Sequence, residues 1–193
     1  TDIYELKAAV LAARENSDKP ILCTMTFEEN MRTFTGCSIS SMALTLNGLG
    51  VDAMGINCSL GPKQLAPVCE ELMKWTNVPV ILKPNAGLPD PATNKYDVLP
   101  EDFAEQMKTA ALYGVSIFGG CCGTTPEYIS KLKYVLEKTD IKREKITIPA
   151  AVCSYSKTVI INQQRIIGER INPTGKKLFK EACKKFGVSV VPQ

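Results

Sequence analysis

Cysteine is the residue type whose placement in this chain most directly indicates chemistry. Cys58 follows a short apolar segment, 53–57, and the adjacent Cys121 and Cys122 follow another, 115–118, with glycines framing both positions. Thiolates are good zinc ligands, and a catalytic zinc site keeps one of its four tetrahedral positions open. The Cys-x-x-Cys pairs typical of structural zinc sites are absent. The pattern predicts that these three cysteines bind one zinc ion, which activates a thiol substrate.

Other interpretations of the cysteines stay open at this point. A cysteine at a strand end can be a small buried hydrophobic residue beside a tight turn, and a vicinal pair can form a redox disulfide. The remaining five cysteines lack glycine-framed partners, so we expect packing or incidental thiols at Cys23, Cys37, Cys69, Cys153 and Cys183. The chain has no histidine, which excludes mechanisms that need an imidazole base within it.

Composition limits the class of protein. The 193 residues carry a formal net charge of +3, which gives no strong field for nucleic acid or a membrane surface. No apolar run approaches the ~18 residues of a membrane span, and no signal peptide opens the chain. Eight cysteines in such a chain favour free thiols or metal ligands over a disulfide framework. We therefore expect a cytoplasmic protein without nucleic-acid or membrane partners.

The elements that must position the cysteines alternate between strands and helices. Apolar strands are predicted at 20–26, 51–57, 78–82 and 115–118, and amphipathic helices at 1–14, through 42–46, and at 62–75, 100–113 and 125–136. Such alternation indicates an α/β fold with a parallel sheet, either doubly wound or a (β/α)8 barrel. A whole barrel takes about 250 residues. The four units therefore suit the last four βα units of a TIM-type barrel.

The alternation of predicted strands and helices ends at residue 138. Residues 139–164 are predicted to be an interdomain linker with short edge strands at 146–149 and 158–161. A strand and loop at 165–175, a helix at 176–186 and a strand at 188–191 restart the pattern. The expected domains are therefore 1–138, the linker 139–164, and the beginning of a second barrel at 165–193.

Two sets of motifs resemble a known family. Gly55-Ile56-Asn57-Cys58 together with Gly119-Gly120-Cys121-Cys122-Gly123-Thr124 resembles the homocysteine S-methyltransferase family, over residues 1–137. The loop 83–90 looks like that of its methionine synthase branch. The stretch 166–175 resembles the opening of the pterin-binding barrel that follows the homocysteine domain in cobalamin-dependent methionine synthases.

The resemblance implies an activity, cofactors and site residues. It implies methyl transfer to the thiol of homocysteine, giving methionine, with Cys58, Cys121 and Cys122 as Zn²⁺ ligands. Methylcobalamin would be presented by another module, in cis or in trans, and 5-methyltetrahydrofolate would supply the methyl group. Glu29 would receive the amino group of homocysteine, or be an exposed loop carboxylate.

Further residues have weaker implied roles. Asn57 and Asn85 would orient the zinc shell or the substrate, or only stabilise turns. Glu169 and Asn172 match the opening of the pterin barrel, where they would contact pterin or belong to a buried strand-end network.

The resemblance leaves rival functions. One rival is a homocysteine methyltransferase that uses betaine or S-methylmethionine as methyl donor, and another is a non-catalytic, zinc-binding half-barrel. The family's barrel begins with an N-terminal half that nothing here matches. The expectation is therefore a fragment, inactive alone, that carries the C-terminal half of a homocysteine barrel and the start of a pterin barrel.

Overall fold

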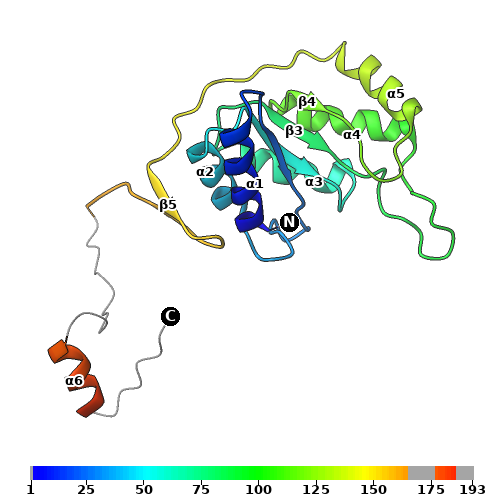
Figure 1. Cartoon of the computed structure of the whole chain (residues 1–193). Helices are drawn as coiled ribbons and strands as arrows, with labels where there is room; N and C mark the ends of the chain where they lie inside the picture. The colour runs from blue at the N-terminus through cyan, green and yellow to red at the C-terminus, as the bar shows by residue number, and fades with distance from the viewer. Residues whose placement is uncertain (1, 165–176, 186–193) are drawn as a thin grey trace. The chain divides into compact units, whose positions relative to one another are not determined.

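The computed structural model describes residues 2–164 and 177–185. The chain divides into two compact units, one ending at Asn162 and the other beginning at Gln163. The first unit holds a parallel sheet with helices α1 to α5, and a separate small hairpin (Figure 1). In the second unit, α6 (Lys177–Lys185) lies within the predicted helix 176–186, whereas Glu169 and Asn172 lie outside the described residues.

The sheet of the first unit contains four parallel strands in chain order. They are β1 (Leu22–Met25), β2 (Ala53–Asn57), β3 (Val80–Lys83) and β4 (Ile117–Phe118). The register pairs Met25 with Ile56, Ile56 with Leu82, and Leu82 with Phe118. Because parallel neighbours share a direction, all four strands end at the same edge, and the loops after them meet there.

One helix precedes β1, one joins each strand to the next, and one follows β4. The helices are α1 (Ile3–Asn16), α2 (Ile39–Gly48), α3 (Pro62–Met73), α4 (Pro100–Leu112) and α5 (Pro126–Leu136). Figure 1 shows them following the sheet from α2 through α3 and α4 to α5, and successive pairs are in contact. The strand order does not reverse, and crossovers between parallel strands are right-handed. The connecting helices therefore lie on one face of the sheet, as in a barrel. The predicted partial (β/α)8 barrel is confirmed over the doubly wound alternative.

The core lies between the sheet and these helices. Met25, Ile56 and Leu82 pair across β1, β2 and β3, and their side chains are buried on the helix side of the sheet. They belong to one apolar cluster with helix residues that are also fully buried, namely Leu46, Leu65, Leu72, Phe103 and Met107. Phe103 and Tyr128 join α4 to α5 edge to face, with ring centroids 5.4 Å apart. This packing fixes the strand ends from which the functional loops leave.

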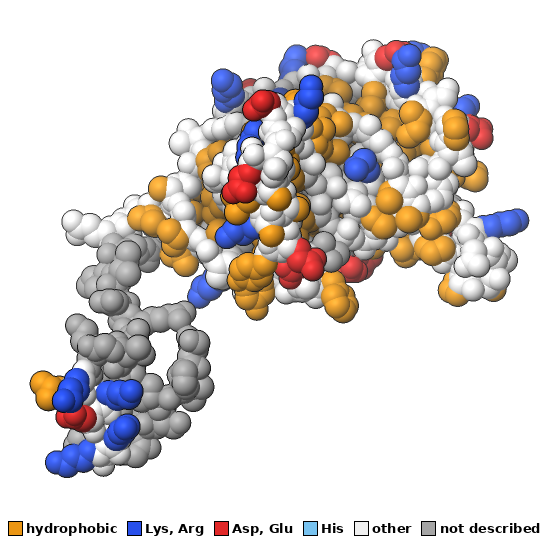
Figure 2. Space-filling view, in the orientation of Figure 1, with side chains coloured by type: hydrophobic (Ala, Val, Ile, Leu, Met, Phe, Trp, Pro, Cys, Tyr) orange, Lys and Arg blue, Asp and Glu red, His pale blue; other side chains and the backbone are white. Residues whose placement is uncertain are grey.

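The unit also exposes apolar surface. Leu22, on the edge strand β1, has 55% of its surface exposed, and Figure 2 shows hydrophobic side chains spread over the visible face. Within the described ranges, β1 and β4 have no further strand beside them. Four strands form only part of an eight-stranded barrel.

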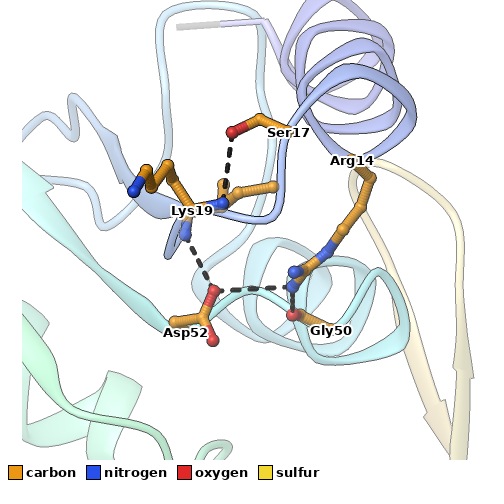
Figure 3. A network of polar contacts seen from close by, with 6 residues as sticks. Arg14, Ser17, Lys19, Gly50 and Asp52 are labelled. Carbon is orange, nitrogen blue, oxygen red and sulfur yellow. Dashed lines mark hydrogen bonds and ion pairs between the residues drawn. The ribbon is translucent and has the colours of Figure 1, made fainter.

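A polar network joins the elements at the opposite end of the strands (Figure 3). Arg14, near the end of α1, hydrogen-bonds to the carbonyl of Gly50 and lies 3.5 Å from the carboxylate of Asp52. The same carboxylate accepts a hydrogen bond of 2.8 Å from the N–H of Ile21. Asp52 precedes β2 and Cys58 follows it, so this network is structural and remote from the cysteines.

Replacing Arg14 with alanine should therefore lower the free energy of unfolding by only about 1 kcal/mol, because exposed ion pairs are screened by water. The ion-paired side chains of Arg14 and Asp52 are 38% and 48% exposed. Urea unfolding of Arg14→Ala beside the wild type measures the change. A loss above about 3 kcal/mol would show that the network contributes far more than an exposed ion pair.

The segment after α5 differs in part from the prediction. No strand forms at 146–149, because the backbone of Ile146 pairs with the side chain of Asn77 and Pro149 has no N–H to donate. Instead, β5 (Ala151–Cys153) and β6 (Thr158–Ile160) form an antiparallel hairpin. The hairpin contacts the start of α2 through a hydrogen bond between the hydroxyls of Thr158 and Ser40, which are 2.9 Å apart.

Candidate metal centre

Three thiols meet at the carboxyl edge of the sheet. Cys58 directly follows β2, and Cys121 and Cys122 follow β4 after two glycines. The Sγ atom of Cys122 is 3.8 Å from that of Cys58 and 3.9 Å from that of Cys121, and all three lie within 4.8 Å of one another. These separations exceed the bond of about 2.05 Å in a disulfide. The cysteines are thus free thiols gathered from two loops.

The backbone directs Cys58 into this cluster. Cys58 and Ser59 both have left-handed conformations, with φ of 63° and 65°. Non-glycine residues rarely adopt this conformation, and it is often retained at functional sites. The N–H of Cys58 donates to the carbonyl of Lys83 at the end of β3 (2.9 Å). The sharp turn is therefore tied to the neighbouring strand.

The loop after β3 holds the vicinal cysteines. The N–H of Cys121 donates to the carbonyl of Pro84 (2.8 Å), and the N–H of Cys122 donates to Oδ1 of Asn85 (3.1 Å). The carbonyl of Cys122 accepts from the N–H of Ala86 (2.8 Å). Residues 84–86 therefore fix both cysteines from one side.

The surroundings of Cys58 and Cys121 shift the pKa values of these two thiols in opposite directions. Burial raises the pKa of Cys58, but hydrogen bonds from the Ser59 backbone and from neighbouring side chains outweigh it and leave that pKa lowered. Burial and the nearby thiols raise the pKa of Cys121 to about 11. A single thiolate at Cys58 is favoured, and crowding opposes a second negative charge unless a cation joins the cluster.

The structure brings Asn85 and Asn57 to this centre. Asn85 is 6% exposed, and the oxygen of its side chain accepts a hydrogen bond from the N–H of Cys122. The Asn85 side chain also helps to lower the pKa of Cys58. Asn57 is the last residue of β2 and directly precedes Cys58. Asn85 therefore contacts Cys122, and Asn57 adjoins Cys58 in the sequence.

Glu29 lies in an exposed turn after β1. The N–H of Met31 donates to the carbonyl of Glu28 (3.0 Å), which closes the turn around Glu29. No described hydrogen bond or ion pair joins Glu29 to the cysteines.

Sequence reasoning missed two residues beside the cluster. The ring of Tyr96 packs on Gly123, and the hydroxyl of Thr124 donates to the carbonyl of Cys121 (2.7 Å). Tyr96 is the only aromatic residue in the loop 83–99, and this was the one signal that could have identified it.

Other cysteines do not extend the centre. Cys23, Cys37 and Cys69 are buried, as packing residues should be, whereas Cys153 is exposed on the hairpin. Burial raises the pKa of Cys69 to about 12 and, as the main cause, that of Cys37 to about 11. Among the described residues, only Cys58, Cys121 and Cys122 form a cysteine, aspartate, glutamate or histidine group able to hold a metal ion.

Comparison with known proteins agrees with the fold and the cysteine motifs. The sequence model of the family described as homocysteine S-methyltransferase matches residues 1–136. The chain belongs to the homocysteine S-methyltransferase family. The family is one of methyltransferases, and the matched residues include every element that builds the cysteine cluster.

Its relatives include much longer proteins. The methionine synthases of Mycobacterium tuberculosis and Mycobacterium leprae are each 32% identical to this chain, over 192 and 197 aligned residues. Each alignment covers 94% of the chain and 16% of the relative. The chain therefore spans about a sixth of these relatives.

Solved structures share the fold. The homocysteine methyltransferase MmuM of Escherichia coli in its metallated form gives a TM-score of 0.55 at 24% identity, covering 69% of this chain and 41% of that one. Its oxidized form gives a TM-score of 0.57 at 22% identity, covering 67% and 41%. The described residues of this family member include no helix that is long and apolar enough to cross a bilayer.

Proposed function

We propose that this chain carries the zinc centre at which the sulfur of homocysteine is methylated to give methionine. Cys58, Cys121 and Cys122 would be the zinc ligands. The observation that carries the proposal is the convergence of their Sγ atoms to within 4.8 Å of one another at the carboxyl edge of the sheet. Active sites of (β/α)8 barrels lie at this edge.

The cluster fits zinc in size and chemistry. A tetrahedral shell with Zn–S bonds of about 2.3 Å has S···S edges of about 3.8 Å. The cysteines show 3.8 and 3.9 Å for two of their three edges. The metallated form of the Escherichia coli homocysteine methyltransferase also supports a metal here. Three reduced thiols are required, which agrees with a cytoplasmic setting.

The protein supplies three ligands and leaves one side accessible. When bound, Zn²⁺ would lower the pKa of the homocysteine thiol and keep its sulfur a nucleophilic thiolate at neutral pH. The left-handed turn at Cys58 and the hydrogen bond from the N–H of Cys122 to Asn85 hold the ligands before metal arrives. Cys122 is the exposed member of the cluster, so the substrate sulfur would approach beside it.

Glu29 and Asn57 are proposed substrate contacts. Homocysteine carries an ammonium group, which a carboxylate can bind by a charge-assisted hydrogen bond. Glu29 is exposed in the turn after β1, at the same edge of the sheet as the cysteines, so its carboxylate is available. Asn57, one residue before Cys58, would orient the substrate or its sulfur.

The methyl donor is proposed to be methylcobalamin presented by another module, with 5-methyltetrahydrofolate as the source of the methyl group. The family model ends at residue 136, whereas the likeness to methionine synthases covers 94% of the chain and so includes residues beyond it. This supports residues 139–164 as an interdomain linker and 165–193 as the start of a pterin-binding barrel. Glu169 and Asn172 would then contact pterin.

Donor preference tests this function. Joined to the other half of the proposed barrel and to a cobalamin-binding module, the zinc-loaded chain supplied with homocysteine should form methionine from methylcobalamin. Betaine and S-methylmethionine should give none above the protein-free background. Methionine formed from betaine or S-methylmethionine instead would overturn the donor assignment. A zinc-loaded protein that methylates homocysteine with none of the three would indicate a non-catalytic zinc module.

Metal affinity should rise with pH, because binding displaces protons from thiols. Cys121, with a pKa raised to about 11, is protonated in the metal-free protein at neutral pH. Each displaced proton makes the apparent zinc affinity rise about tenfold per pH unit, so the slope between about pH 6 and about pH 8 should be at least about tenfold per unit. Competition with a chelator of known affinity measures this slope, and a flat profile would contradict thiolate ligation.

A further inference from the structure

Tyr96 forms one wall of the cysteine cluster. Its ring lies on Gly123, one residue after Cys122, so closely that a Cβ atom on Gly123 would be 2.4 Å from Cγ and Cδ2 of the tyrosine. Gly123 also has a φ of 79°, a conformation that favours glycine. The backbone after Cys122 is therefore shaped to receive the tyrosine ring.

The loop that carries Tyr96 is anchored on both sides of it. Tyr96 is bridged to Pro89 across the loop, and the carboxylate of Asp97 accepts from the N–H of Leu88 (2.9 Å). The N–H of Val98 donates to the carbonyl of Ala86 (3.1 Å), the residue whose N–H binds Cys122. Tyr96 thus belongs to a continuous set of hydrogen bonds that ends at the vicinal cysteines.

A second tyrosine anchors the same loop from the helix side. The hydroxyl of Tyr128, on α5, donates to the carbonyl of Val98 at 2.7 Å. Its ring is buried against Phe103 and belongs to the core. Tyr128 therefore supports the loop without being one of the residues in the cysteine cluster.

Tyr96 lies beside Cys122, because its ring is packed on the next residue, Gly123. Burial, and then the neighbouring side chain of Cys122, raise the pKa of Tyr96. A phenolic hydroxyl can donate a hydrogen bond, and a cysteine sulfur can accept one. Cys122 is exposed, whereas Cys58 and Cys121 are half-buried, so fewer neighbours limit the freedom of its side chain. A hydrogen bond to its sulfur would restrict that freedom.

We propose that Tyr96 is a positioning residue of the metal centre: its ring packs on Gly123, and its hydroxyl donates a hydrogen bond to the sulfur of Cys122. This inference rests on the proposed function, because it concerns Cys122 as a metal ligand. The hydrogen bond holds Cys122 in its ligand position and withdraws electron density from the thiolate. Partners of this kind around metal ligands typically change metal affinity about 10- to 100-fold when they are removed.

The variant Tyr96→Phe tests the hydroxyl while keeping the ring. Co²⁺ is the probe, because its thiolate-to-metal charge-transfer absorption reports the electron density on the sulfur ligands. We expect Tyr96→Phe to bind Co²⁺ about tenfold more weakly than the wild type. Its charge-transfer band should move to lower energy, since the sulfur of Cys122 no longer shares its charge with a donor. Neither readout requires turnover.

Tyr128→Phe is the matched control. It removes one hydroxyl from the support of the same loop but leaves the donor to Cys122 in place. The inference predicts that Tyr128→Phe keeps the wild-type charge-transfer energy. Equal shifts in the two variants, or no shift and unchanged affinity in Tyr96→Phe, would overturn the role of the Tyr96 hydroxyl. Failure of the wild type to bind Co²⁺ through sulfur would instead overturn the proposed function itself.

Discussion

Replacing Cys121 with alanine is expected to abolish both stoichiometric zinc binding and methyl transfer to homocysteine. Cys121 is one of three thiols within 4.8 Å of one another, and the described residues offer no fourth cysteine, aspartate, glutamate or histidine to substitute for it. Loss of a direct ligand should exceed the about 10- to 100-fold effect of losing an outer partner. Zinc content after dialysis and methionine formation measure the two losses.

An exposed cysteine outside the cluster supplies the control. Cys153 lies on the β5–β6 hairpin, and Cys153→Ser should keep both zinc and activity. Thermal unfolding of the metal-free proteins should be similar for Cys121→Ala and wild type, which separates loss of the ligand from loss of the fold. Full zinc occupancy in Cys121→Ala would remove that residue from the ligand set.

Replacing Gly55 with alanine is expected to have the second-largest effect. It should lower the free energy of unfolding by about 3 kcal/mol or more. Gly55 lies in the middle of β2, and a Cβ atom there would be 2.0 Å from the carbonyl oxygen of Ile81 and 2.7 Å from its Cβ. Those atoms belong to the adjacent strand β3, which pairs through this register. The added methyl group would push the two strands apart.

The same change should also weaken metal binding. Cys58 follows β2 by one residue, and the loop after β3 holds Cys121 and Cys122. Urea unfolding gives the stability loss, and chelator competition gives the metal affinity. Gly48→Ala is the control, because a Cβ atom on Gly48 at the end of α2 meets nothing within 4 Å. Equal free energies of unfolding for Gly55→Ala and Gly48→Ala would contradict the close approach of β2 and β3 at Gly55.

Much of the fold was predictable because local signals agreed with the global pattern. Pro62, Pro100 and Pro126 each open a helix at the position where the missing N–H costs nothing, and the structure begins α3, α4 and α5 at these residues. The apolar strands appear within about two residues of their predicted bounds. What periodicity alone left open was the choice between a doubly wound sheet and a barrel, which the strand order decides.

The convergence of the cysteines was also predictable. Residues that follow parallel strands meet at one edge of the sheet, so Cys58 and the Cys121–Cys122 pair could be placed together before their distances were known. The glycine frame marked their loops as tight. The predicted role of these thiols as zinc ligands remains a proposal that the geometry supports.

Loop contacts were not predictable in the same way. Tyr96 packs on Gly123, beside Cys122, only because hydrogen bonds fold the loop 84–99 back on itself, and no periodic signal encodes that path. The β-branched residues at 146–149 resembled a strand, yet the side chain of Asn77 takes the backbone bonds of Ile146. In both cases, long-range side-chain contacts overrode local propensity.

X-ray absorption at the zinc edge, with and without homocysteine, tests the central claim most directly. The account predicts three sulfur neighbours in the zinc-loaded protein and a fourth, at about 2.3 Å, when homocysteine is added. Methionine, whose thioether cannot become a thiolate, should not produce the same shell. Stoichiometric zinc whose sulfur count stays unchanged with saturating homocysteine would contradict the claim that this centre binds and activates the substrate thiol.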